Sequence, residues 1–291
     1  TRYAALPQDC VTVGGPMLAA PYSALKTQGF GGKAVFAFLS QLPESSDEGR
    51  LAWRFFTSNE DQISAVLGFA SNELGIHSFG ILAPNDSYGE RMSALFASSA
   101  ARQGCSVRTA TYPLGDVKSW TKLTGEFVQA VNVAQGTLPR ARADFGAIFL
   151  PDGWSNMDML ISMLRYHGAY NRVMLGTVLW EQGLKGGHAL DPETFGLSVF
   201  PGVWDDNSES PAAVDFRNAM NGTGEKPGDW SVLGYDFVRF ASALGLRDMV
   251  KDSASLNATL AAGPKLEWAG APVVWDALGL AHRQLILFQP A

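Results

Sequence analysis

The chain has 291 residues, of which 46% are hydrophobic, 17% charged and 11% aromatic, and its formal net charge is −6. These values are typical of a folded chain of one large or two ordinary domains, and they exclude disordered, collagen-like and disulfide-scaffold proteins. The 22 Lys and Arg are scattered along an acidic sequence, which argues against nucleic acid and anionic membrane surfaces as partners.

Short apolar runs alternate with turns and amphipathic helical stretches through the first two thirds of the chain. The predicted strands are Cys10–Val13, Ala34–Leu39, Phe79–Ala83, Val107–Tyr112, Phe145–Leu150 and Val173–Gly176. Most are continuous apolar runs, which are typical of strands buried on both faces of a parallel sheet. Between them, apolar residues recur at helical spacing, as at Met92, Leu95 and Phe96. This alternation predicts an α/β doubly wound fold.

The last third of the chain changes character. Pro- and Gly-rich turns between residues 200 and 230 precede two predicted helices, Val232–Leu244 and Ser255–Ala262. The C-terminal stretch predicts a hairpin in which Val273–Trp275 and Gln284–Phe288 flank a turn. No run approaches the roughly 20 apolar residues of a membrane-spanning helix.

Motifs of enzymes and metal sites are missing from the sequence. It contains no phosphate-binding loop, no G-x-S-x-G nucleophile elbow and no H-E-x-x-H zinc motif, and its four histidines are isolated. Cys10 and Cys105 are too few for a disulfide framework or a zinc site, and they fit either two buried thiols or one disulfide. We therefore predict no catalytic residue, metal or cofactor.

Acidic residues follow several of the predicted strands. Asp86, Asp152, Glu181 and Asp205 all come shortly after an apolar strand. In open α/β sheets, ligands bind outside the carboxyl ends of the strands, so these residues are candidate ligand contacts. For Asp86 and Asp152, helix capping is an equally good explanation, because each precedes the start of a helix.

Three tryptophans also follow successive strands. Trp154, Trp180 and Trp204 lie a few residues beyond Leu150, Gly176 and Phe200. Large amphipathic rings at neighbouring loop positions can line one cleft and stack on a flat or apolar ligand. The alternative is that these rings pack beneath loops or at an interface with a partner.

Four short segments, in order along the chain, resemble the type I periplasmic solute-binding proteins, the group that includes the leucine-binding proteins of ABC transporters. These segments are Val13–Pro16 (VGGP), Pro84–Gly89 (PNDSYG), Gly234–Asp236 (GYD) and Trp275–Gly279 (WDALG). Phe145–Asp152 (FGAIFLPD), Leu175–Trp180 (LGTVLW) and Pro84–Met92 with Phe96 are most similar to the lipoprotein branch of this group known as penicillin-binding protein activators.

The resemblance implies two doubly wound α/β lobes joined by three crossovers, which we expect near Thr57–Asp61, Pro201–Asp206 and Gly263–Gly270. Lobe 1 would then comprise residues 1–60 and 205–266, and lobe 2 residues 61–204 and 267–291. Family members open with a β-α-β unit ahead of the segment that matches Cys10–Pro16. Only nine residues precede Cys10 here, so we expect lobe 1 to lack this unit.

The resemblance also implies where a ligand would bind. Amino-acid-binding members hold the ligand's carboxylate with two hydroxyls and its ammonium with an acid, and the matching positions here are Ala19, Leu42 and Val178, with Ser40 and Glu181 close by. Burying a zwitterion without these partners is unfavourable, so we expect an apolar, aromatic or glycan-like ligand. The predicted ligand-binding residues are Ser40, Gln41, Asp86, Tyr88, Asp152, Trp154, Trp180, Glu181, Trp204 and Asp205.

The predicted function is therefore a non-enzymatic, extracytoplasmic binding domain that closes two lobes over a small molecule. Its expected partners are that ligand and an ABC permease or a cell-wall synthase, and its expected location is the periplasm, with a lipid anchor on a segment ahead of the chain. The alternative is an envelope lipoprotein that regulates a peptidoglycan synthase through protein contacts.

Overall fold

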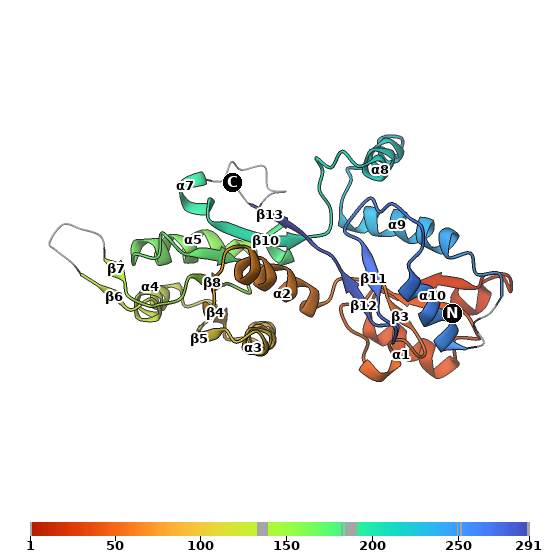
Figure 1. Ribbon diagram of the computed structural model, residues 1–291, viewed down its shortest axis with the longest axis horizontal. Helices are drawn as coiled ribbons and strands as arrows, with labels where there is room; N and C mark the ends of the chain where they lie inside the picture. Colours follow the sequence, from red (N-terminus) through yellow and green to blue (C-terminus); the bar gives the residue numbers. More distant parts are fainter. Residues whose placement is uncertain are drawn as a thin grey trace. The chain divides into compact units, whose positions relative to one another are not determined.

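The computed structural model describes residues 2–132, 139–181, 183, 191–248, 250 and 252–289. The chain forms two compact units (Figure 1). Unit 1 consists of residues 1–61 and 203–285, and unit 2 of residues 62–202 and 286–291. The largest difference from the expected lobe boundaries is in the segment 267–285, which is expected in lobe 2 and lies in unit 1. No helix in the described part of the chain is both long and apolar enough to cross a membrane.

Unit 2 is built on a six-stranded sheet with the order β13-β10-β9-β8-β4-β5. Its strands are β4 (Ser78–Pro84), β5 (Ser106–Tyr112), β8 (Ala147–Phe149), β9 (Val173–Leu175), β10 (Ser198–Gly202) and β13 (Ile286–Phe288), and a separate pair is formed by β6 (Ala130–Val131) and β7 (Arg140–Ala141). Its helices are α2 (Asn59–Gly68), continued by a π-helical turn (Phe69–Glu73), α3 (Ser87–Arg102), α4 (Val117–Phe127), α5 (Trp154–Tyr166), the 3-10 turn η4 (Val178–Trp180) and α7 (Pro192–Phe195). All neighbouring strands of the six are parallel except β13, which pairs antiparallel with β10.

Helices cover both faces of this sheet, as the continuous apolar runs of the sequence predicted. On one face, α2 and α3 pack against β4 and β8, and the rings of Phe96 and Phe149 stack with their centroids 4.5 Å apart. On the other face, α4 and α5 pack over the same strands, around Trp120 and Leu160. Unit 2 therefore has the doubly wound α/β arrangement expected from the sequence.

Unit 1 contains a smaller parallel sheet with the order β1-β2-β3. Its elements are a short 3-10 helix (Arg2–Ala5), β1 (Thr12–Gly14), α1 (Ala19–Gln28), β2 (Ala34–Ala37), a second 3-10 turn (Ser45–Asp47), β3 (Trp53–Arg54), α8 (Pro211–Asn221), α9 (Asp229–Leu244), α10 (Ser253–Ala262), β11 (Val273–Trp275) and β12 (Ala281–Arg283). The central strand β2 is fully buried, because α1 packs on one of its faces and α9, α10 and the β11–β12 hairpin pack on the other.

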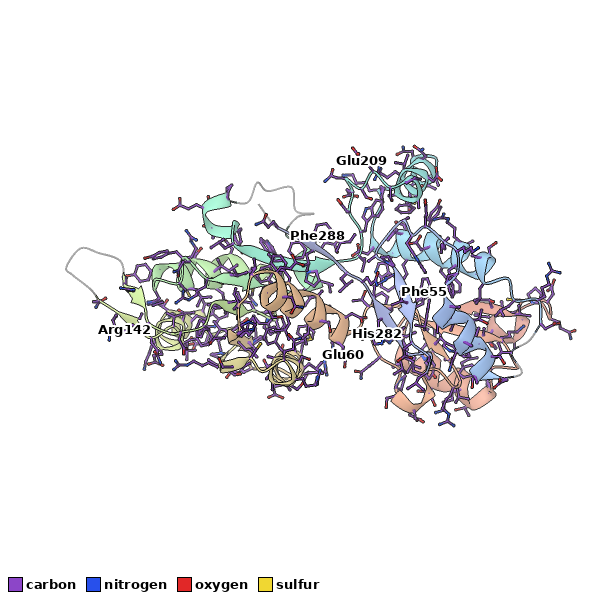
Figure 2. The ribbon with its side chains drawn as sticks, viewed as in Figure 1. Phe55, Glu60, Arg142, Glu209, His282 and Phe288 are labelled. Atoms are coloured by element: carbon purple, nitrogen blue, oxygen red, sulfur yellow. The ribbon has the colours of Figure 1, made fainter. Side chains whose placement is uncertain are left out.

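Aromatic side chains fill the core of unit 1. The ring of Phe55, which is labelled in Figure 2, lies 5.1 Å from that of Phe240 and 6.0 Å from that of Trp275. Phe36 on β2 packs edge-on against Phe240 at 5.0 Å. Aromatic pairs in such tilted and edge-on arrangements stabilise a core beyond the burial of their area.

The C-terminal hairpin differs from the prediction. β11 pairs with β12 (Ala281–Arg283), not with the apolar run Gln284–Phe288. The run instead supplies β13, which joins the sheet of unit 2 beside β10. A loop of five residues between β11 and β12 is enough to reverse the chain. The apolar run that follows is then free to pair with β10 in the other unit. Sequence periodicity alone does not tell which of the two strands an apolar run pairs with.

A buried carboxylate organises the part of unit 1 where the chain passes to and from unit 2. Asp236 on α9 is fully buried, and its two oxygens accept hydrogen bonds from the backbone N–H groups of Ala269 and Gly270, each at 2.9 Å. The next N–H, of Ala271, donates to the carbonyl of Val203 at 2.8 Å. The chain returns from unit 2 to unit 1 at Val203. Asp236 therefore holds the segment 269–271, to which Val203 is hydrogen-bonded.

We predict that Asp236→Ala lowers the free energy of unfolding by about 2–5 kcal/mol, because it leaves two buried N–H groups without an acceptor. Asp236→Asn keeps one acceptor oxygen and should lose less. Urea titration followed by far-UV circular dichroism checks both values, with exposed Asp215→Ala on α8 as the matched control. Equal stability of D236A and D215A would contradict the role given to Asp236.

Candidate functional site

The carboxyl ends of three parallel strands of unit 2, β4, β5 and β8, carry acidic and phenolic side chains. Asp152, three residues after β8, accepts hydrogen bonds from the Tyr112 hydroxyl at 2.5 Å, from the N–H of Gly153 at 2.6 Å and from Asn156 Nδ2 at 2.7 Å. Tyr112 is the last residue of β5 and is buried. Parallel strands bring their carboxyl ends to one edge of a sheet, which is why residues 40 positions apart meet here.

The electrostatics of this edge keep its phenols neutral. Burial, together with the hydrogen bond to Asp152, raises the pKa of Tyr112 far above its ordinary value. Burial also raises the pKa of Tyr88, although a hydrogen bond with Thr177 offsets part of the effect. The negative charges of Asp86 and Asp152 also raise the pKa of both phenols. Neutral phenols beside two carboxylates combine hydrogen-bond donors with acceptors at one edge.

Asp86 and Tyr88 are placed by the start of α3. Asp86 is the N-cap residue, and its Oδ1 accepts from the N–H of Gly89 at 2.7 Å. A side chain at Gly89 would meet the carbonyl oxygen of Pro84 at 2.2 Å, so the turn closes only with glycine at this position. Of the two roles weighed for Asp86, helix capping is therefore present in the structure, and contact with a ligand stays a prediction.

Trp154 and Trp180 lie together in unit 2, in its core. Trp180 is fully buried, and its ring centroid is 5.9 Å from that of half-buried Trp154. Trp180 lies against Gly176, where an added Cβ would approach the indole to 2.3 Å. Glu181, the next residue, is half-buried. The two indoles thus pack beneath the end of β9, and a role for them in ligand contact stays a prediction.

The remaining predicted residues belong to unit 1. Ser40 and Gln41 are exposed just after β2. Trp204 is buried, lies edge-on to Phe216 at 4.9 Å, and donates from Nε1 to Asp206 at 2.5 Å. Asp205 is half-buried and accepts from the N–H of Asn207, which closes a turn. Trp204 therefore belongs to a different unit from the other two tryptophans.

A fourth tryptophan, which the sequence analysis missed, is the most accessible of the eight, all of which lie in the described part of the chain. Trp230, the second residue of α9, is 54% exposed. Its ring stacks on that of Phe56 with the centroids 5.2 Å apart and the planes inclined by 20°. The sequence predicts a helix that begins at Val232, which leaves Trp230 outside it, whereas the structure starts α9 at Asp229. Pro227-Gly228-Asp229 is the signal for this earlier start.

Buried charged groups of unit 1 hold the backbone at Phe56 in place. Arg54 on β3 donates from Nη1 to the carbonyl of Phe56 at 3.1 Å and lies 3.5 Å from Asp61. Asp61 is in turn 4.0 Å from Nδ1 of His282, an exposed residue on β12 that is labelled in Figure 2. Arg54 and Asp61 are both buried, so the backbone that carries Phe56 is held by a desolvated ion pair.

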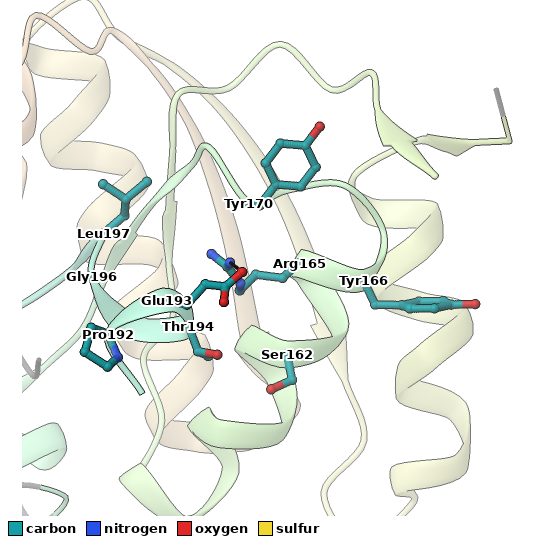
Figure 3. Close-up of a pocket in the computed structure, with 9 residues that line it drawn as sticks. All are labelled: Ser162, Arg165, Tyr166, Tyr170, Pro192, Glu193, Thr194, Gly196 and Leu197. Atoms are coloured by element: carbon teal, nitrogen blue, oxygen red, sulfur yellow. Dashed lines mark ion pairs between the residues drawn. The ribbon is translucent and has the colours of Figure 1, made fainter. Parts of the chain in front are cut away.

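Unit 2 also has an open surface pocket of about 830 Å³ at the C-terminal end of α5 (Figure 3). Arg165 lies 3.9 Å from Glu193 in this pocket, and Tyr166 and Tyr170 are more than half exposed. None of the predicted ligand-binding residues lines it. Elsewhere in the described chain, no group of three or more His, Cys, Asp or Glu side chains is arranged to hold a metal ion.

Comparison with known proteins gives a consistent result. The sequence matches the family described as periplasmic binding protein over residues 12–289. An ABC transporter substrate-binding protein from Desulfitobacterium hafniense is 17% identical with a TM-score of 0.66, over 95% of this chain and 76% of that chain. The leucine-binding protein LivK from Thermotoga maritima is 15% identical with a TM-score of 0.58, over 95% and 75%.

A third similar structure is the C-domain of LpoA from Haemophilus influenzae, described as a regulator of PBP1A. It is 15% identical with a TM-score of 0.61, over 96% of this chain and 79% of that chain. At these identities the likeness concerns the fold. Comparison with curated proteins finds no match.

We predict that Trp230→Phe removes most of the tryptophan fluorescence that acrylamide can quench, because its indole is the most exposed. Stern–Volmer titration measures the accessible fraction. Trp204→Phe, which removes an indole that is 5% exposed, serves as the control and should leave that fraction unchanged. Equal quenching of the wild type and W230F would show that the Trp230 ring is covered.

Proposed function

Because this chain belongs to the periplasmic binding protein family, we propose that it is a non-enzymatic, extracytoplasmic domain whose two units close on a small molecule. The observation that carries the proposal is the exposed indole of Trp230, stacked on Phe56 at the carboxyl end of the unit 1 sheet. An exposed indole held in a fixed orientation offers a flat apolar face on which a ring-containing ligand can stack.

Polar contacts to the ligand would come from the carboxyl edge of unit 2 and from the loop after β2. We propose that Asp86, Tyr88 and Asp152 accept and donate hydrogen bonds to the ligand's hydroxyl or amide groups. Ser40 and Gln41 are exposed and can offer further donors and acceptors. Of the other predicted contacts, half-buried Trp154, Glu181 and Asp205 would lie behind these groups, whereas Trp180 and Trp204 are buried and would act only as packing.

The ligand class follows from what the site lacks. Ala19, Leu42 and Val178 stand where the resemblance places the groups that hold an amino-acid zwitterion, and Leu42 is only 3% exposed. An ammonium or carboxylate facing these side chains would lose its hydration without compensation. We therefore propose a neutral ligand with a ring that stacks on Trp230, of the aromatic or glycan type.

A second candidate function is regulation of a peptidoglycan synthase through protein contacts. Its support is the likeness to the LpoA C-domain, whose TM-score of 0.61 is no lower than the 0.58 of the leucine-binding protein LivK. The deep packing of Trp180 and Trp204, at 0% and 5% exposure, also favours it, because indoles committed to the core do not shape a ligand cleft.

We predict that intrinsic fluorescence, titrated with a panel of amino acids, sugars, muropeptides and aromatic acids, shows a saturable change with a neutral ring-containing compound. Trp230→Ala should weaken the affinity by about tenfold or more, as for an aromatic anchor at the centre of a contact. Tyr166→Ala removes an exposed ring elsewhere on unit 2 and should leave the affinity unchanged.

The same panel distinguishes the two functions. Silence across all compounds, together with retention of a peptidoglycan synthase in a pull-down, would contradict the small-molecule proposal and favour the regulator. Saturable binding of a charged amino acid would contradict the proposed ligand class alone.

A further inference from the structure

A pocket of about 590 Å³ on unit 2 is lined by three arginines, although Lys and Arg are scattered along the sequence. Arg140 and Arg142 come from β7 and the segment after it, and Arg172 precedes β9. Asp144 is the only acidic residue among the described residues that line the pocket. In a chain whose net charge is −6, this lining carries two more positive than negative charges.

Extended backbone places two of the guanidinium groups on the same side. Along residues 140–144, exposed and buried positions alternate: Arg140, Arg142 and Asp144 are exposed, whereas Ala141 and Ala143 are 8% and 3% exposed and belong to the core. Successive side chains of an extended segment point to opposite sides. The small alanines anchor the segment, and the arginines next to them are directed to solvent.

The third arginine is held against this segment. Arg172 donates from Nη2 to the carbonyl of Ala143 at 3.0 Å and from Nη1 to Asn171 Oδ1, also at 3.0 Å. Its Nε is buried and has no hydrogen-bond partner among the described residues. A guanidinium has five N–H donors, so Arg172 keeps donors that these two bonds do not use.

A close backbone contact with Gly168 fixes the segment of residues 139–141. Gly168, with a φ of +90°, follows α5, and an added Cβ there would lie 2.5 Å from both the N–H nitrogen of Ala141 and the carbonyl oxygen of Pro139. The turn therefore passes directly under β7, which only glycine permits. The segment that lines the pocket is thus a supported part of the fold, and Figure 2 labels Arg142 on it.

Within the described part of the chain, no acidic side chain neutralises Arg140 or Arg142. Neither side chain forms an ion pair with any residue that the structure describes. Planar guanidinium groups match the geometry of carboxylate and phosphate, to which they can donate two parallel hydrogen bonds. Three of them around one concave surface are suited to a ligand with more than one oxyanion group.

We propose that the pocket of Arg140, Arg142 and Arg172 binds a small organic or inorganic polyanion, with phosphate or carboxylate groups that replace solvent on the three guanidiniums. This site is independent of the proposed binding function, because it lies at the β6–β7 pair and the amino end of β9, not at the carboxyl edge of the sheet. The ligand would be recognised by charge and by bidentate hydrogen bonds.

Isothermal titration calorimetry at low ionic strength tests the proposal, with pyrophosphate and citrate as the two probes. Affinity is a better measure than thermal stability here, because phosphate and related anions stabilise folded proteins without binding at a site. We expect saturable 1:1 binding that weakens as NaCl is added, since salt screens the attraction. Binding of pyrophosphate alone identifies a phosphate ligand, binding of citrate alone a carboxylate ligand, and binding of both a general polyanion site.

Arg142→Gln and Arg140→Gln should each weaken the affinity by about tenfold through loss of charge-assisted hydrogen bonds. Arg102→Gln is the matched control, because Arg102 is an exposed arginine on α3 of the same unit that bonds only to Ser99 among the described residues. The absence of saturable heat with both probes, or an equal loss of affinity in R102Q, would overturn the proposal. Arg140, Arg142 and Arg102 are all exposed. We therefore expect circular dichroism to show that none of these three substitutions changes the fold.

Discussion

The interaction that ties α9 to the segment by which the chain is anchored in unit 1 is the pair of hydrogen bonds that the buried carboxylate of Asp236 accepts from Ala269 and Gly270. They hold the segment whose next residue bonds to Val203, where the chain enters unit 1 for the second time. Arg283, close to the third passage, lies near Asp236 and Asp61, and its burial lowers its pKa to about 10. Charged groups that are expensive to bury are thus placed where the chain passes between its units.

The same helix connects this support to the proposed ligand contact. Asp236 and Trp230 are both on α9, one facing the interior and the other exposed at the first turn. Phe56, on which the indole rests, is bonded through its carbonyl to Arg54. A ligand stacked on Trp230 would therefore contact a helix and a strand end that buried polar contacts hold in place. Such preorganised support keeps a binding site rigid.

The sequence was sufficient for the parallel strands, because burial on both faces leaves a continuous apolar run. Phe79–Ala83 lies within β4, and Val107–Tyr112 within β5. It was not sufficient for the C-terminal pairing, since β12 and β13 are both short and only tertiary packing assigns one to each unit. The rule that ligands bind at the carboxyl ends of strands made Asp152 a candidate contact, and it applies equally to its hydrogen-bond partner Tyr112, the last residue of a predicted strand.

The sequence did not predict the arginine pocket or the exposed ring of Trp230, because both depend on contacts between residues that are far apart in the chain. Arg172 meets Arg140 and Arg142 only when the chain folds, so a scattered distribution in sequence became a local cluster in space. The accessibility of Trp230 depends on the length of α9 and on a partner 174 positions away, as its contact with Phe56 shows. Neither periodicity nor motif spacing contains this information.

Hydrogen–deuterium exchange with mass spectrometry tests the central claim most directly, comparing the free protein with the protein saturated by the compound that binds it. The account predicts slower exchange at the first turn of α9, around Trp230, and at the starts of α3 and α5 beside Asp86 and Asp152. Unchanged exchange at all three places, with protection confined to other surfaces, would contradict the proposed ligand contacts at Trp230, Asp86 and Asp152.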